Sequence, residues 1–148
     1  MEQSKDRSDW SKSFMYSLHE TYFLVEKRLE QKLTEVGGIT FSQFLIMLPL
    51  RCERTACQTE IANFLHLTEA TVSRHISGMT KDGYLLRKED PGNRRKHILS
   101  LTPKGTKAFM RAHTLIDAEL KDIFDDIPLS DRKYITNTFD TVLNKLKK

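Results

Sequence analysis

The sequence predicts a mainly helical protein with one small β-hairpin, in the α+β class. Apolar residues recur every three or four positions along most of the chain, which is the spacing of amphipathic helices. Two short β-prone runs, "YLLRKE" and "KHILSL", flank Asp90-Pro91-Gly92-Asn93, a hairpin signal with a loop longer than the tightest type. The 148 residues suit a single domain, 1–148, whose core needs neither a disulfide nor a structural metal.

The first helix is predicted over residues 11–36, where the apolar positions form one stripe. This stripe consists of Phe14, Leu18, Tyr22, Val25, Leu29, Leu33 and Val36. Gly37-Gly38 should end the helix, since glycine commonly follows the last helical turn. Thr40 and Gln43 have the form of a capping box, which predicts the start of a second, apolar helix. Pro49 should kink or end that helix.

A helix, a short turn and another helix are predicted next. The first of these helices spans about 58–65 and offers to a core Ile61, Ala62, Phe64 and Leu65. Leu67 in the turn is expected to be buried, and the hydroxyl of Thr68 caps the following helix. The core-facing residues of that helix are Val72, Ile76 and Met79. Lys81-Asp82-Gly83 ends it, with Gly83 in the left-handed conformation.

Two further helices are predicted in the last third of the chain. Thr102 is an N-cap followed by Pro103 at the first helical position, a common arrangement at a helix start. The apolar stripe of this long helix is Phe109, Ala112, Ile116, Leu120, Ile123 and Ile127. Pro128-Leu129-Ser130 breaks it, and the last helix carries Ile135, Phe139, Val142, Leu143 and Leu146.

The positive charge of the chain is concentrated in one segment. The formal net charge is +4, but residues 80–107 contain eight basic and three acidic side chains, a net of +5. The other 120 residues therefore sum to −1. A concentrated basic segment indicates an anionic partner.

Several classes of protein are excluded by composition and spacing. The apolar run at 44–50 is too short to span a bilayer, and the polar N-terminus has no signal-peptide core, so we expect a cytoplasmic protein. Two cysteines and scattered histidines give no zinc-ligand spacing, so we expect neither a metal nor another cofactor. An enzyme is not expected either, because the sequence lacks a phosphate-binding glycine loop, a nucleophile elbow and a metal-ligand cluster.

A helix, a tight turn, a second helix and a basic hairpin, in this order, form a winged helix-turn-helix. The stretch 68–105 resembles the DNA-binding core of the MarR family of bacterial transcription regulators. Four motifs carry the resemblance: "ATVSR" in the second helix, "KDGYL" at its exit, "DP…RR" in the hairpin, and the closing "LTPKG". The resemblance implies a winged helix-turn-helix core over about 40–102, flanked by N- and C-terminal dimerisation helices over 11–36 and 103–148.

The helix that follows Thr68 has a polar face that suits a DNA groove. At about 100° per residue, the side opposite its apolar face holds Ala70, Arg74, Ser77 and Lys81, flanked by Thr71 and Ser73. Small side chains let the backbone approach a groove, hydroxyls donate to phosphates or base edges, and the Arg74 guanidinium suits guanine O6 and N7. A solvated helix face would explain any one of these residues, but not the short polar set beside a basic hairpin.

The hairpin is expected to bring cations to the minor groove, which concentrates negative potential where it is narrow. Arg94 and Arg95 sit where the resembled family places its groove-entering arginine. In an alternating strand they point to opposite sides, one into the groove and one to a phosphate or to Asp90. Asn93 stands where the family often has an acid that clamps this arginine. The residues assigned only to positioning on phosphates are Thr68, Lys88 and Lys96.

The resemblance also implies a homodimeric, sequence-specific transcription regulator, a repressor that a small ligand, often aromatic, releases from double-stranded DNA. A two-fold dimer places two recognition helices roughly 34 Å apart on one face of a pseudo-palindromic operator. The aromatic residues that could line a ligand cleft are Trp10, Phe14, Tyr16, Tyr22, Phe23, Phe41 and Phe44. An aromatic stripe at helical spacing is, however, more often plain core.

Two alternative functions stay open. Cys57 lies just before the helix at 58–65, where a helix N-terminus favours the thiolate, and Cys52 is nearby in the chain, so a redox-responsive regulator is one alternative. Against it, free cysteine is among the most buried residue types, and the family's peroxide sensors carry their reactive cysteine in the first helix, where this chain has none. The other alternative is a winged helix that binds protein partners and shows no salt-dependent association with a duplex.

Overall fold

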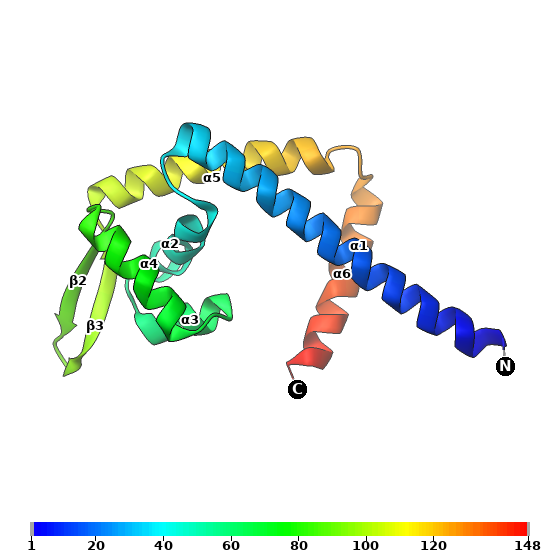
Figure 1. Ribbon diagram of the computed structural model, residues 1–148, viewed down its shortest axis with the longest axis horizontal. Helices are drawn as coiled ribbons and strands as arrows, with labels where there is room; N and C mark the ends of the chain where they lie inside the picture. The colour runs from blue at the N-terminus through cyan, green and yellow to red at the C-terminus, as the bar shows by residue number, and fades with distance from the viewer. Residues whose placement is uncertain (1, 148) are drawn as a thin grey trace. The chain divides into compact units, whose positions relative to one another are not determined.

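The computed structural model describes residues 2–147, without the side chains of residues 2–8, 37, 94 and 95. The chain forms two compact units, residues 1–116 and residues 117–148, and each is described by itself. The organisation as one domain over 1–148 stays a prediction. Along the chain the elements are α1 (Glu2–Lys32), the π-helical turn η1 (Leu33–Gly37), α2 (Phe41–Glu53), β1 (Ala56–Cys57), α3 (Gln58–Leu65), α4 (Glu69–Lys81), β2 (Leu85–Asp90), β3 (Asn93–Leu101), α5 (Pro103–Phe124) and α6 (Leu129–Leu146) (Figure 1).

The predicted mainly helical fold with a small β-hairpin is confirmed, and the sheet contains one strand more than predicted. Three antiparallel strands pair in the order β1-β3-β2. In the hairpin of β2 and β3, Leu85 lies opposite Leu101. β1 contributes only two pairs, Ala56 with Leu99 and Cys57 with Ile98. Two residues are too few to show an alternating pattern, which is why periodicity does not reveal β1.

The core of residues 1–116 lies between α2, α3, α4 and the sheet, which are grouped together in Figure 1. The predicted inner face of α4 is confirmed, because Val72, Ile76 and Met79 are 0%, 3% and 0% exposed. From α5, the ring of Phe109 stacks on Phe44 of α2 with 5.1 Å between ring centroids. The first turns of α5 therefore belong to the same core as the helix-turn-helix.

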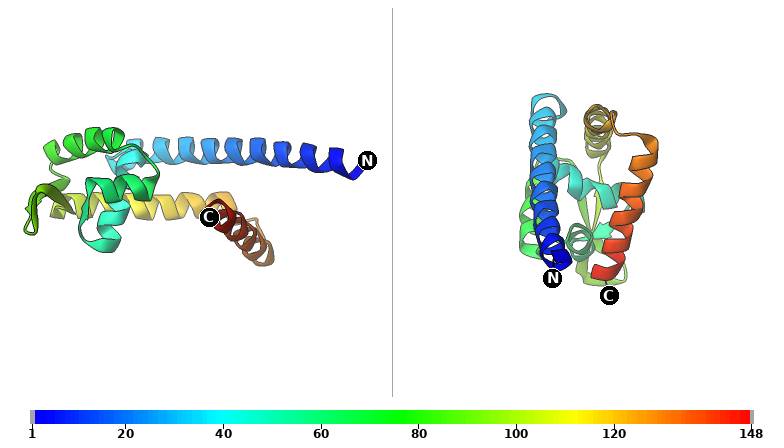
Figure 2. Two further views of the ribbon diagram at one scale, coloured as in Figure 1. Left: turned by 90° about the horizontal axis from the view of Figure 1, so that it is seen from below. Right: turned by 90° about the vertical axis from the view of Figure 1, so that its right-hand side faces the viewer.

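α1 is longer than the sequence pattern predicts. It begins at Glu2 rather than near Ser11, and Figure 2 shows it as one long helix. Its first turns are polar, so the apolar periodicity on which the prediction rests has no signal there. The predicted end is confirmed by Gly38, whose φ is 72° and whose N–H donates to the Leu33 carbonyl at 3.0 Å.

α2 begins with the predicted capping box. The Gln43 N–H donates to the Thr40 hydroxyl at 3.1 Å, and the Gln43 side chain accepts from the Thr40 N–H at 3.0 Å. Pro49 does not end the helix, which continues to Glu53. Pro49 itself is buried with its neighbour Leu50, and this packing offsets the loss of one backbone hydrogen bond. Among the described residues no single helix is long and apolar enough to cross a membrane, and only a pair bent by 88°, residues 9–36 with 41–53, meets that test together.

The turn between α3 and α4 departs from the prediction in what it buries. His66 adopts a left-handed conformation with φ 53°, which histidine tolerates better than most residues, and the chain turns there. Phe64 and Leu67 were expected in the core, but they are 55% and 45% exposed. A helix of eight residues buries only a narrow face, and the described core residues of α3 are Ile61 and Ala62. The predicted end of α4 is confirmed by Gly83 with φ 77°.

The hairpin turn is shorter than predicted. The strands pair as far as Asp90 opposite Asn93, so Pro91-Gly92 alone forms the turn. The carboxylate of Asp90 accepts the N–H of Gly92 at 2.7 Å, which closes the turn locally. The extra length lies in β3 instead, as a register shift between the Glu89–His97 and Asp90–Asn93 pairs. Strict alternation of side chains, the premise for opposite orientations of Arg94 and Arg95, does not hold through this irregularity.

The two C-terminal helices have the predicted order, but α5 ends at Phe124, so Ile127 of the predicted stripe lies beyond it, and Leu129 and Ser130 belong to α6 rather than to the break. The hydroxyl of Thr102 accepts the N–H of Gly105 at 2.9 Å at the start of α5, and α6 starts at Leu129 directly after Pro128. The stripe of α5 is buried at Phe109, Ala112 and Ile116. In α6 none of the described residues is buried.

Gly105→Ala should lower the free energy of unfolding by about 1–3 kcal/mol, measured by urea denaturation. A Cβ at residue 105 would overlap the backbone carbonyl of Tyr84, which has no flexible end that could move aside. The control is Gly78→Ala on α4, where a Cβ meets no atom within 4 Å. That change should raise the free energy of unfolding by about 0.5–1 kcal/mol, because alanine is the better helix former. Undiminished stability of Gly105→Ala would contradict the close approach.

Stability should depend on pH through Glu60, whose carboxylate accepts the Cys57 N–H at 2.7 Å. This bond, more than any other contact, lowers the pKa of Glu60 from its ordinary value of 4.5. The stabilisation is therefore complete above pH 4.5 and is lost as the pH falls through the lower folded-state pKa. Urea titrations should show Glu60→Ala less stable than wild type at neutral pH, with the difference vanishing in acid.

Glu53→Ala, at an exposed glutamate that ends α2, controls for the loss of a carboxylate elsewhere. A difference between wild type and Glu60→Ala that persists undiminished in acid would argue against the hydrogen bond as the source of the stabilisation.

Candidate nucleic-acid interface

The outer face of α4 gathers most of the predicted recognition residues. Because Val72, Ile76 and Met79 face the core, the opposite side of the helix is in water. The residues exposed there are Ala70, Arg74, Ser77 and Lys81, and the half-buried flanking residues are Thr71 and Ser73. A shallow hollow is lined by Ala70, Ser73, Arg74 and Ser77. We call this set of residues the α4 outer face.

The start of α4 is fixed by hydrogen bonds that occupy most of the donors and acceptors of the Thr68 and Thr71 hydroxyls. The Thr68 hydroxyl accepts the Thr71 N–H at 3.2 Å, as predicted for an N-cap, and lies 2.9 Å from the Thr71 hydroxyl. Each hydroxyl carries one proton, and one of the two protons lies in the hydrogen bond between them. The other proton remains to be donated to a phosphate. Sequence reasoning missed Gln58, whose amide donates to the Glu69 carbonyl at 3.2 Å and joins the first turns of α3 and α4. Only the packing of two helices reveals that contact.

The predicted hairpin residues belong to β2 and β3, and β2 packs beside α4. Lys88, Asn93 and Lys96 are exposed. The backbone of Arg94 and Arg95 belongs to β3, but their side chains lie outside the described residues, so their roles stay predictions. The side chain of Asp90 is engaged in the turn through the Gly92 N–H.

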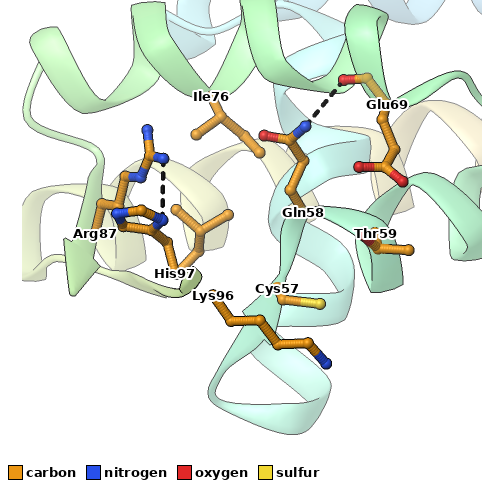
Figure 3. Close-up of a pocket in the computed structure, with 9 residues that line it drawn as sticks. Cys57, Gln58, Thr59, Glu69, Ile76, Arg87, Lys96 and His97 are labelled. Carbon is orange, nitrogen blue, oxygen red and sulfur yellow. Dashed lines mark hydrogen bonds between the residues drawn. The ribbon is translucent and has the colours of Figure 1, made fainter. Parts of the chain in front are cut away.

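A cleft of about 220 Å³ separates the hairpin from the first turns of α3 and α4 (Figure 3). On its hairpin side, Arg87 and His97 face each other, with 3.2 Å between the guanidinium and the imidazole Nδ1. Sequence reasoning missed both residues, because the contact runs diagonally across two strands whose register is not visible in the sequence. On the helix side the cleft is lined by Cys57, Gln58, Thr59 and Glu69.

Charges of both signs meet near this cleft. Lys96 helps to lower the pKa of Glu60, after the larger effect of the hydrogen bond from Cys57, whereas Asp90 raises it. Lys96 therefore interacts with a carboxylate as well as being available to a phosphate. We expect its contribution to anion binding to be smaller than that of an arginine on the α4 outer face.

The two cysteines are free and lie in different surroundings. Cys57 is half-buried and is the N-cap residue of α3, as predicted, and Cys52 is exposed near the end of α2. Their redox role stays a prediction. Within the described part of the chain, no group of three or more histidine, cysteine, aspartate or glutamate side chains could hold a metal ion.

The aromatic residues suggested for a ligand cleft divide into separate groups. Trp10 stacks on Phe14 along α1, with 5.4 Å between ring centroids. The ring centroid of Phe41 lies 6.4 Å from that of Phe44, and Phe44 is buried in the core. The remaining three, all on α1, are exposed: Tyr16, Tyr22 and Phe23. Phe44 is core, as the plain reading of such a stripe expects, and the ligand cleft stays a prediction.

Part of the chain is similar in sequence to known proteins. Residues 39–97 match the model of the MarR family. An uncharacterised HTH-type transcriptional regulator of Bacillus cereus is 29% identical over 118 residues, which cover 80% of this chain and 78% of that protein.

Solved structures share the fold of this chain. Sco3205, a MarR family transcriptional regulator from Streptomyces coelicolor solved in complex with DNA, superposes with a TM-score of 0.84 at 20% identity, over 93% of this chain and 88% of that one. A cysteine-to-serine mutant of MarR from E. coli, complexed with operator DNA, superposes with a TM-score of 0.81 at 17% identity, over 88% of this chain and 94% of that one. Residues 39–97 therefore match a MarR family domain, and the chain has the winged helix-turn-helix fold of these solved regulators.

Proposed function

We propose that the protein is a sequence-specific transcription regulator that binds double-stranded DNA through the α4 outer face and the hairpin. The observation that carries the proposal is that Arg74 stands exposed among the short side chains of Ala70, Ser73 and Ser77, around a shallow hollow. A helix with this face can enter a major groove closely, because no bulky side chain holds its backbone away. Two structural neighbours were solved with DNA, which supports the same reading.

Within this proposal the side chains divide into those that read bases and those that hold phosphates. Arg74 is the proposed base reader, since a guanidinium can donate two hydrogen bonds to one guanine. Ser73 and Ser77 flank it as further donors. The hairpin cations Arg94 and Arg95 are assigned to the minor groove and its phosphates, and Asn93 lies beside them. Phosphate positioning is assigned to Thr68, Thr71, Lys81, Lys88 and Lys96.

The apolar surfaces outside the core support a homodimer built from α1, α5 and α6. On α6 the stripe of Ile135, Val142, Leu143 and Leu146 is 43–77% exposed, and on α1 Phe14 and Tyr22 are 38% and 58% exposed. Exposed stripes of this extent are unusual for a monomer and are typical of surfaces that pair. The residue ranges 11–36 and 103–148 are accordingly proposed as dimerisation helices, around a DNA-binding core at about 40–102.

We further propose that the protein represses its target and that a small aromatic ligand releases it. The support is the match of residues 39–97 to the MarR family model and the aromatic residues of α1. A response to oxidation through Cys57 and Cys52 is the alternative form of release, and a winged helix that binds only proteins is the alternative function. A random-sequence duplex selection, repeated with salicylate and with diamide, separates these options.

Arg74→Ala should weaken binding to the selected duplex by about 10- to 100-fold, measured by fluorescence anisotropy, because one bidentate base contact is lost. Arg51→Ala, which removes an exposed arginine at the end of α2, should leave the affinity unchanged. The double change of Arg94→Ala with Arg95→Ala should weaken binding and also flatten its salt dependence. Wild-type affinity in both the Arg74 and the double variant would refute the DNA-binding proposal.

Leu143→Glu should convert the dimer to a monomer in sedimentation velocity, since a charge would enter the apolar interface. The matched control is Asn144→Glu, at the next position of α6, which is exposed as well. DNA affinity should fall with the dimer, because two half-sites are no longer held by one particle. A wild-type protein that sediments as a monomer at the concentration where it binds DNA would overturn the proposed assembly.

A further inference from the structure

The exit of α4 is held by the start of α5 through three consecutive carbonyl groups. The Asp82 carbonyl accepts a hydrogen bond from Lys104 Nζ at 2.6 Å. The next carbonyl, of Gly83, accepts from the Thr102 hydroxyl at 2.7 Å, and the Tyr84 carbonyl accepts from the Thr102 N–H at 3.0 Å. Every carbonyl from 82 to 84 is therefore satisfied by Thr102 or Lys104, and we call this set of contacts the α4–α5 clamp.

Lys104 makes the charged contact of the α4–α5 clamp, whereas the two donors of Thr102 are neutral. Asp82 is the C-cap of α4, so the ammonium group of Lys104 lies where the helix dipole and the unpaired carbonyls favour a cation. To reach it, the side chain passes next to Gly83, since a Cβ there would lie 3.9 Å from Lys104 Cδ. Its ammonium also lies 4.7 Å from the centre of the Tyr84 ring, within the range of a cation–π contact.

The clamp extends to the end of α1. The Tyr84 hydroxyl donates to the Gly38 carbonyl at 3.3 Å, and Gly38 is the residue that terminates the α1–η1 helix. Tyr84 thus contacts Lys104 with its ring and Gly38 with its hydroxyl. One small cluster joins the exit of α4 to the two helices α1 and α5, which are outside the helix-turn-helix.

We infer that Lys104 is a positioning residue for DNA binding: it holds the C-terminal end of α4 in place without touching DNA itself. This inference rests on the proposed function, in which α4 is the recognition helix. A helix fixed at both ends enters the groove in one orientation, whereas a loose end must be ordered on binding and lowers the affinity. Charge alone would assign Lys104 to phosphate binding, so the two roles must be separated by experiment.

The decisive comparison uses Lys104→Met, which keeps the apolar stem but removes the cation, and Lys107→Met, which removes an equal charge from the next turn of the same helix. With the duplex selected by the wild-type protein, Lys104→Met should bind about two- to fivefold more weakly than Lys107→Met, as expected for one helix-end cation. Lys104→Arg, which retains a cationic donor, should recover most of the loss.

The salt dependence distinguishes positioning from phosphate contact. The slope of log K against log salt should be the same in wild type and Lys104→Met, because no phosphate contact is lost. A slope reduced by about 0.9 in that variant would make Lys104 a phosphate ligand and overturn the inference. Equal affinities of the Lys104 and Lys107 variants would overturn it as well.

Hydrogen exchange of the free protein tests the clamp independently of DNA. Three backbone hydrogen bonds close the end of α4. The Asp82 amide donates to the Gly78 carbonyl, the Gly83 amide to the Thr80 carbonyl, and the Tyr84 amide to the Met79 carbonyl. These amides should exchange faster in Lys104→Met than in Lys107→Met. A wild-type protein that binds no duplex refutes the proposed function. In that case, equal exchange rates in Lys104→Met and Lys107→Met also refute the clamp. Faster exchange in Lys104→Met supports the clamp but leaves it without a role in DNA binding.

Discussion

Val72, Ile76 and Met79 seal one side of α4 in the core, and this burial determines which side of the helix remains in water. Each such side chain contributes roughly 1.5–3 kcal/mol when it is buried. Turning α4 by one residue, about 100°, would exchange part of this apolar face for polar residues and cost several kcal/mol. No hydration of Arg74 or Ser77 compensates for that loss, so packing sets the rotation of α4 about its own axis.

Burial fixes the rotation of α4 but leaves its ends to polar contacts. At the N-terminal end, the Thr68 cap and the Gln58 amide satisfy backbone groups of the first turn. At the C-terminal end, Gly83 turns the chain and the α4–α5 clamp takes up the carbonyls that follow. Each of these bonds is individually weak, and all but the part-buried bond of Thr102 to Gly83 are exposed, which makes them suited to adjusting the orientation of the helix rather than to holding the fold together.

The elements predicted correctly are those whose signal is local. The capping box of Thr40 and the left-handed Gly83 depend only on neighbours in the chain, and the inner face of α4 depends only on a 3.6-residue period. The wrong predictions concern the limits of that period. Phe64 and Leu67 are apolar residues that a short helix and its turn leave exposed to solvent. The register shift in β3 depends on how β2 and β3 pair, which no local pattern predicts.

In the candidate site, too, local patterns predict some residues and tertiary packing alone reveals the others. The α4 outer face could be predicted because it is the complement of a periodic core, and the family motifs add the hairpin cations. Gln58, Arg87 and His97 could not, since each meets a partner on a different element at a separation set by the tertiary fold. The α4–α5 clamp is of this kind too: "LTPKG" indicates a helix start, but only the structure places Lys104 beside the carbonyl of Asp82.

The helices outside the core raise a question of stability that bears on the proposed dimer. An isolated helix of the length of α6, 18 residues, is only marginally stable in water, and most helices depend on burying an apolar face. Yet α6 buries none of its described residues, and Leu129 and Leu146 are 69% and 77% exposed. A second copy that covers this stripe would supply the missing burial. The same contact would set the distance between two α4 helices, so the stability of the ends of the chain and the spacing of the DNA half-sites would depend on one interface.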